Sequence, residues 1–349
     1  MEERKESLVD KIGMPRIIII SFFLILLIAA VPLGLSFTGL LSDTIRRWAM
    51  YGILVLAMVP AVQSGIGLNF GISLGIVAGL LGATLSIQLG FSSPWISLFV
   101  ALGFGTFFSI FLGIGYGQIL NRVKGSEMTV STYVGFSVIA FMNIVWLSLP
   151  FTSGELIWPL GGKGMRNTIS LQSSYGDVLN NWLAFDIAGV RVPTGLILFF
   201  LGACFLVWLF MRSKTGVAMS ATGANPTFTK SSGIETDRMR ILGTMVSTML
   251  GAIGIIIYSQ SYGFLQLYNA PLMMGFHCVA AVLIGGATVS RAKISHVILG
   301  TFLFQGILTV ALPVVNNLLP ESNLSDVIRI IISNGIILYA LSKTKGGSK

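Results

Sequence analysis

The polar residues that could contact a solute are concentrated in one short segment of an apolar region. The segment from Ser64 to Gly71 reads SGIGLNFG and places Asn69 among three glycines. Glycine weakens a helix and frees backbone groups to face a cavity, while amide and hydroxyl side chains supply further hydrogen bonds. The sequence therefore predicts a broken helix that binds a polar solute; close packing through small residues is the alternative. The candidate contact residues are Gln63, Gly65, Gly67, Asn69, Phe70, Ser73, Asn143 and His277.

The sequence lacks the residues that ATP binding, catalysis or metal binding would need. The sequence has no GxxxxGK[ST] phosphate loop, so ATP is not bound in that manner. No nucleophile is paired with a base, and the two cysteines show no metal-ligand spacing, so we expect no catalytic, metal or cofactor site. Only Glu127 and His277 are candidates for an intramembrane proton carrier, and a packing role is favoured for His277. Proton coupling is therefore disfavoured.

The composition indicates a protein that crosses a membrane several times. Of 349 residues, 54% are hydrophobic and 10% charged, whereas a soluble domain has about 25% charged residues. No Asp, Glu, Lys or Arg occurs between Arg47 and Arg122 or between Arg240 and Arg291. Each interval far exceeds the roughly 20 residues that cross a bilayer as a helix. The net charge of +9 is attributed to cytoplasmic loops and not to nucleic-acid binding.

Hydropathy predicts an all-α polytopic membrane protein of about ten transmembrane helices in a single domain, residues 1–349. The first span is Ile17–Leu35, and three more lie within Trp48–Asn121, with breaks near Ser64–Asn69 and Gly90–Pro94. The others are Thr129–Leu149, Pro193–Met211, Ile241–Tyr258, Pro271–Thr288, Ser295–Leu312 and Val327–Leu341.

The distribution of Lys and Arg orients these spans. With both termini in the cytoplasm, sixteen Lys and Arg residues lie inside and six, including Arg46 and Arg47, lie outside. This is the bias of the positive-inside rule. Residues 1–16 then form a cytoplasmic N-terminus, 151–192 an external loop with short interfacial helices, and 212–240 a cytoplasmic loop.

The cytoplasmic loop contains the signals of one short helix. Asn225 followed by Pro226 is a helix start, and Gly233 suits the left-handed position after a helix end, so Pro226–Ser232 is predicted to be helical. Gly216 and Gly223 are interpreted as flanking hinges. A short rigid helix could be pushed by a soluble partner; an ordinary capped surface helix is the alternative.

This loop resembles a known motif. KTGVAMSATGANPTFTKSSGI is similar to the coupling-helix segment of ABC importer permeases of the branched-chain amino acid and sugar type. The matching positions are Gly216, Gly223, Asn225, Pro226, Ser232, Gly233 and Ile234; Thr227 and Thr229 depart from the pattern. SGIGLNFGISLGIVAGLLGA is similar to a ribose-type segment, with Gly67 replacing its usual Asp. KGSEMTVSTYVGFSVIA looks more like the BMP-type nucleoside permeases.

The resemblance implies a translocation subunit without an ATPase site of its own. Its partners would be cytoplasmic ABC ATPases that use ATP and Mg²⁺, a second permease as homodimer or heterodimer, and an external substrate-binding protein. The location would be the inner membrane of a prokaryotic cell. The solute would be a sugar or nucleoside-like molecule; a branched-chain amino acid, or a secondary carrier or channel working alone, is the alternative.

A weak internal similarity suggests an inverted repeat. LGATLS at Leu81–Ser86 resembles GGATVS at Gly285–Ser290, and Gly71 and Gly275 stand at the same offset. The predicted topology makes the two spans antiparallel, as an inverted repeat requires.

Overall fold

The computed structural model describes residues 14–158 and 164–318, together with 331 and 334–335. These residues are mostly helical. The first helices are α2 (Met14–Ala30), α3 (Phe37–Leu56), α4 (Met58–Gln63), the 3₁₀ turn η1 (Phe70–Ile72), α5 (Ser73–Leu89), α6 (Pro94–Arg122) and α7 (Glu127–Ser148). They are followed by α8 (Val178–Asn181), α9 (Thr194–Arg212), α10 (Lys214–Ala224), α11 (Pro226–Ser231), α12 (Thr236–Tyr262), α13 (Ala270–Ile284) and α14 (Ile294–Leu318).

The polytopic all-α prediction is confirmed. Among the described residues, seven helices are long and apolar enough to cross a membrane, and the apolar helices Arg16–Ala30 and Ala270–Ile284 are shorter. Nine of the ten predicted spans coincide with helices, and the tenth, Val327–Leu341, lies largely outside the described residues. The number of crossings and the orientation stay predictions.

One predicted boundary is wrong. The sequence predicts that Arg46 and Arg47 precede the spans within Trp48–Asn121, but both lie inside α3, which begins at Phe37. The Ser36 hydroxyl caps that helix by accepting a hydrogen bond from the Gly39 N–H. Within the predicted cytoplasmic loop 212–240, the structure adds α10 and the start of α12 to the predicted short helix, which is α11.

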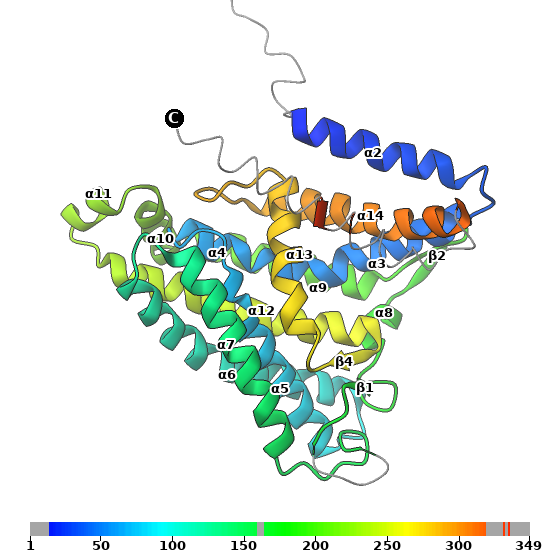
Figure 1. Ribbon diagram of the computed structural model, residues 1–349, viewed down its shortest axis with the longest axis horizontal. Coiled ribbons are helices and arrows are strands. Elements are labelled where there is room, and N and C mark those ends of the chain that lie inside the picture. The colour runs from blue at the N-terminus through cyan, green and yellow to red at the C-terminus, as the bar shows by residue number, and fades with distance from the viewer. Residues whose placement is uncertain (1–13, 159–163, 319–330, 332–333, 336–349) are drawn as a thin grey trace, which may run out of the picture.

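Helix α12 lies at the centre of the fold and packs against α6, α5 and α3 (Figure 1). Glycines allow this close approach. A Cβ atom at Gly75 of α5 would lie 2.2 Å from the Thr248 carbonyl oxygen, and one at Gly82 would lie 2.3 Å from the Gly105 nitrogen of α6. Between membrane helices, small residues replace the hydrophobic driving force with close van der Waals packing.

The two loop regions lie at opposite ends of the molecule. Figure 1 shows α10 and α11 at one end, and α8 with the strands β1 (Thr168–Ser170) and β2 (Phe185–Ile187) toward the other. Strand β1 pairs antiparallel with β4 (Phe264–Gln266), and β2 pairs with β3 (Val190–Val192). The predicted external loop therefore contains one short helix, α8, and three short strands within its described residues.

Glycine packing between α5 and α6 generates a stability prediction. Gly82→Ala places a methyl group against the backbone of Gly105 and Ala101, which cannot move aside, and should lower the free energy of unfolding by about 1–3 kcal/mol. Gly103→Ala, also on α6, is the matched control because no atom lies within 4 Å of its Cβ position. The thermal midpoint of the detergent-solubilised protein should fall only for Gly82→Ala. Equal midpoints would contradict the packing described.

Candidate functional site

The predicted break near Ser64–Asn69 is confirmed. Helix α4 ends at Gln63 and η1 begins at Phe70, and Gly65 and Gly67 between them adopt φ of 81° and 85°. Only glycine adopts this left-handed region without strain. The side chains of Ser64, Leu68 and Asn69 are fully buried, so this irregular backbone is enclosed by protein. Non-helical backbone within a membrane protein is tolerated under that condition.

Asn69 lies at the centre of a buried hydrogen-bonded triad. Its Oδ1 accepts a hydrogen bond of 2.8 Å from the Tyr116 hydroxyl of α6, and its Nδ2 donates one of 2.9 Å to the Ser247 hydroxyl of α12. Gly71 allows the tyrosine to reach this position, because a Cβ there would lie 2.2 Å from the Tyr116 hydroxyl. In this conformation the amide of Asn69 fixes the break to two helices.

Phe70 and Ser73 instead line a small cavity between η1, α7 and α13. Its volume of ≈ 10 Å³ is about the space of one water molecule. The Phe276 ring of α13 lies 5.6 Å from Phe70 and 6.4 Å from Phe136 of α7, measured between ring centroids. The cavity is lined by Phe70, Ser73, Thr132, Gly135, Phe136, Leu272, Gly275 and Phe276, and none of these is charged.

The two glycines at matching repeat offsets lie in this region. A Cβ at Gly275 would lie 3.6 Å from the Phe70 carbonyl oxygen, and Gly71 follows Phe70 directly. The structure thus places these two glycines near Phe70. The inverted repeat itself stays a prediction.

The remaining predicted solute contacts are separate from the cavity lining. Gln63 donates a hydrogen bond of 2.6 Å from Nε2 to the Ala292 carbonyl oxygen. The His277 ring lies 5.7 Å from Phe304, and its Nδ1 is 2.8 Å from the Met273 carbonyl oxygen. Asn143 is half-buried on α7, and no hydrogen-bond partner for its Oδ1 occurs in the part of the chain that the structure describes.

The short helix predicted at Pro226 is present as α11 and is capped at both ends. Asn225 Oδ1 accepts a hydrogen bond of 3.0 Å from the Phe228 N–H, and Gly233 has a φ of 81°. The Ile234 N–H bonds the Thr229 carbonyl and the Gly233 N–H bonds the Lys230 carbonyl, which together form a Schellman motif. The helix ends at Ser231, and the hydroxyl of the C-cap residue Ser232 bonds the Phe228 carbonyl.

The exposed side of α11 combines an apolar side chain with a groove. Phe228 is 67% exposed, which is unusual for so large a ring at a helix that does not cross the membrane. Beside it, a groove of ≈ 760 Å³ runs between α11 and the start of α12, lined by Pro226, Lys230 and Asp237 among others. Exposed apolar residues rimmed by polar ones mark interaction surfaces.

The interpretation of Gly216 and Gly223 as hinges is wrong. Both lie inside α10, where they allow close packing instead. A Cβ at Gly223 would lie 2.2 Å from the Gln63 carbonyl oxygen and 2.8 Å from the Gly65 nitrogen. Helix α10, which leads directly into α11, therefore rests on the backbone at which α4 ends and the break begins.

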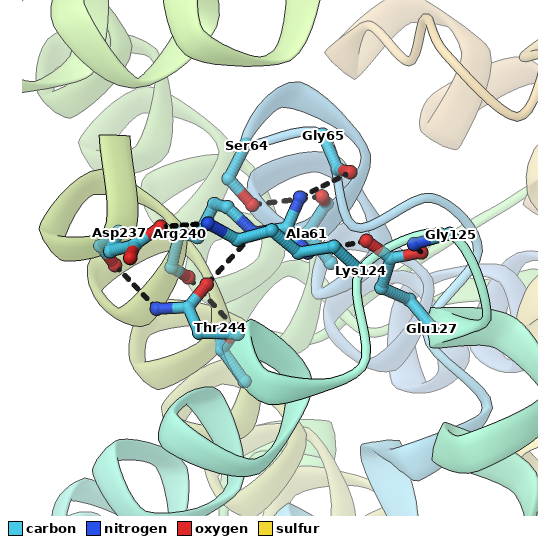
Figure 2. Close-up of polar contacts among 10 residues, drawn as sticks. Ala61, Ser64, Gly65, Lys124, Gly125, Glu127, Asp237, Arg240 and Thr244 are labelled. Atoms are coloured by element: carbon cyan, nitrogen blue, oxygen red, sulfur yellow. Dashed lines mark hydrogen bonds and ion pairs between the residues drawn. The ribbon is translucent and has the colours of Figure 1, made fainter. Parts of the chain in front are cut away.

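Arg240 of α12 connects this break to two further helices (Figure 2). Its Nη1 donates to the Gly65 carbonyl oxygen at 3.2 Å, and its Nε donates to Asn121 Oδ1 at the end of α6 at 2.9 Å. Its Nη2 pairs with Glu127 Oε1, at the first residue of α7, at 2.5 Å. Glu127 Oε2 accepts in turn from the Gly125 N–H at 2.8 Å.

Arg240 and Tyr116 were not found from the sequence. Arg240 counted only as a cytoplasmic charge, and Glu127 was considered only as a proton carrier. One signal is present: each is the last charge before a long uncharged span, and opposite charges at such positions can pair in membrane proteins. Tyr116 carries no comparable signal. Among the described residues, no group of three or more His, Cys, Asp or Glu side chains could hold a metal ion.

Comparison with known families identifies the family of this chain. The sequence profile described as "Branched-chain amino acid transport system / permease component" matches residues 16–336. The chain belongs to this permease family. The matched range includes the broken helix, the capped helix α11 and the Arg240 cluster.

Individual relatives align over shorter stretches. The probable ABC transporter permease protein YphD of Escherichia coli is 32% identical over 153 residues, 43% of each chain. The autoinducer 2 import system permease protein LsrC of Shigella flexneri is 24% identical over 202 residues, 54% of this chain and 57% of the relative. The chain thus spans about half the length of the curated relatives it matches. No solved structure matches it significantly.

The buried triad generates a second prediction. Tyr116→Phe removes the donor to Asn69 Oδ1 and leaves a buried amide oxygen unpaired, which should cost about 1–3 kcal/mol. Tyr133→Phe on α7 makes the same change at a side chain that is 69% exposed and should have no effect. Thermal unfolding in detergent measures both. A Tyr116→Phe midpoint equal to the wild-type midpoint would show that the triad does not hold the break.

Proposed function

We propose that this chain is the translocation subunit of an ATP-driven ABC importer in the inner membrane of a prokaryotic cell. Family membership supports the class, and the printed names of YphD and LsrC describe ABC and import-system permeases. In this proposal ATP and Mg²⁺ are used by separate cytoplasmic ATPase subunits. A second permease completes the pathway, and an external binding protein delivers the solute to the end that carries α8.

The observation that carries the proposal is the contact between α10–α11 and the broken helix. Helix α11 is short, fixed at both ends by its caps, and presents Phe228 outward. A force on α11 passes through α10 to Gly223, which touches the backbone of Gln63 and Gly65. Because these contacts are between backbones, they leave little room for side-chain motion to absorb the displacement.

The solute route in this proposal passes the cavity at Phe70 and Ser73. The Ser73 hydroxyl donates to the Pro271 carbonyl at 2.9 Å, so its lone pairs remain available to accept hydrogen bonds. Phenylalanine rings can stack on an apolar face of the solute. A neutral solute with hydroxyl groups and an apolar face fits this lining best, which favours a sugar or nucleoside-like molecule over a branched-chain amino acid. Because the name of LsrC describes import of autoinducer 2, a first solute screen should include autoinducer 2 and related molecules.

The function is tested by uptake into proteoliposomes that contain the chain with its ATPase and binding protein. Uptake should require ATP on the side of the bilayer where the ATPase subunits lie. It should cease when the ATPase subunits are left out. Asn225→Ala should weaken ATPase association about five- to tenfold, because the lost N-cap costs about 1 kcal/mol or more of α11 stability. Asn225→Asp keeps the acceptor oxygen and should assemble normally.

The outcomes separate the function classes. Uptake by the chain alone, without ATP and without an ATPase, would assign it to secondary carriers or channels. Normal assembly and transport after replacement of residues 226–232 by Gly and Ser would remove the coupling role from α11 while leaving the permease class intact.

The route is tested by enlarging the cavity. Phe276→Ala removes the ring that contacts both Phe70 and Phe136 and should raise the KM for uptake about five- to tenfold, through lost stacking of about 1–1.5 kcal/mol. Phe111→Ala, on the outer face of α6 and 62% exposed, is the control. An unchanged KM for Phe276→Ala would exclude this cavity from the route.

A further inference from the structure

Arg240 is a buried cation that holds four separate segments together. The residue is 8% exposed, and its guanidinium bonds the break at Gly65, α6 at Asn121 and α7 at Glu127 from its own position in α12. Burying a charge is costly unless it is paired and fully hydrogen-bonded. Here Nε, Nη1 and Nη2 each have a partner, so the guanidinium group is held in one orientation.

The segments that Arg240 contacts are those that must move when the transporter opens the solute route to one side of the membrane and closes it to the other. Gly65 belongs to the broken helix and is also contacted by Gly223 of α10. Glu127 begins α7, and Gly135 of the same helix lines the cavity at Phe70 about 12 Å further along the helix axis. Arg240 therefore links the Gly65 break, on which α10 packs, to α7, which forms one wall of the cavity.

The nearby exposed ion pair does not make this connection. Lys124 and Asp237 pair at 2.5 Å, but their side chains are 51% and 59% exposed. Exposed pairs contribute about 0–1 kcal/mol and exchange readily with water. Arg240 therefore differs from the other charges of this end in both burial and number of partners.

We propose that Arg240 is a positioning residue that clamps the Gly65 break to α7, so that displacement of α10–α11 moves both together. The inference rests on the proposed function, because it names the link through which ATP-driven motion reaches the solute route. Glu127 neutralises the buried guanidinium and fixes its orientation. Without the clamp, α10–α11 still displaces the break through Gly223, but α7 stays behind.

The test is Arg240→Lys in the assembled transporter. Lysine keeps the charge for Glu127, but a single ammonium group cannot reproduce the planar fork that reaches Gly65, Asn121 and Glu127 together. ATP hydrolysis should stay within about twofold of wild type, while solute uptake per ATP falls at least about fivefold. Arg122→Lys is the matched control, since this exposed arginine lies at the same end of the molecule.

The remaining outcomes are also decisive. An unchanged uptake-to-hydrolysis ratio for Arg240→Lys, or a parallel fall of both rates, would overturn the proposal. If Arg240→Lys does not assemble, Glu127→Asp, which retains both charges but shortens one side chain, is measured in the same way and should show the same loss of coupling. Failure of both variants to assemble would assign the cluster to folding and overturn the proposal.

Failure of the proposed function gives a different result. It would appear as ATP-independent uptake by the wild-type chain. The clamp alone fails if wild-type uptake depends on ATP and the variants either remain coupled or do not assemble.

Discussion

The structure depends on the requirement that irregular backbone inside a membrane protein be enclosed and hydrogen-bonded. The segment Ser64–Asn69 meets this requirement with neighbours from several helices. Gly223 of α10 approaches its backbone, and Gly243 of α12 approaches the Ser64 side chain, from which a Cβ at Gly243 would lie 2.4 Å away. Asn69 and Arg240 supply the polar contacts. A break packed this tightly can move only together with the helices that enclose it.

This constraint connects the two functional regions of the proposed importer. Membrane helices gain little from the hydrophobic effect when they separate or associate, so small-residue packing and a few polar bonds determine which helices move as one body. In this chain those contacts run from α11 through α10 to the break, and from the break through Arg240 to α7. The cavity at Phe70 lies where α7 and the broken helix meet α13.

Local signals in the sequence predicted the elements, and long-range contacts decided their roles. The Asn225–Pro226 start and the Gly233 end predicted α11 because helix caps depend on residues close together in the sequence. The glycines of the break likewise marked its place. The prediction of hinges at Gly216 and Gly223 is wrong because glycine can provide either flexibility or close packing. Only the neighbours of Gly223 in the fold show which of these two roles applies. Arg240 could not be paired with Glu127, 113 residues away, without the fold.

The central claim is that motion of α10–α11 reaches α7 through the break. The most direct measurement is the distance between spin labels on α7 at position 133 and α9 at position 205, both exposed, in the assembled transporter. Cys204 and Cys278 are buried, which limits background labelling. The account predicts that ATP binding shifts this distance by about 2 Å or more. An unchanged distance in a transporter that hydrolyses ATP and takes up solute would contradict it.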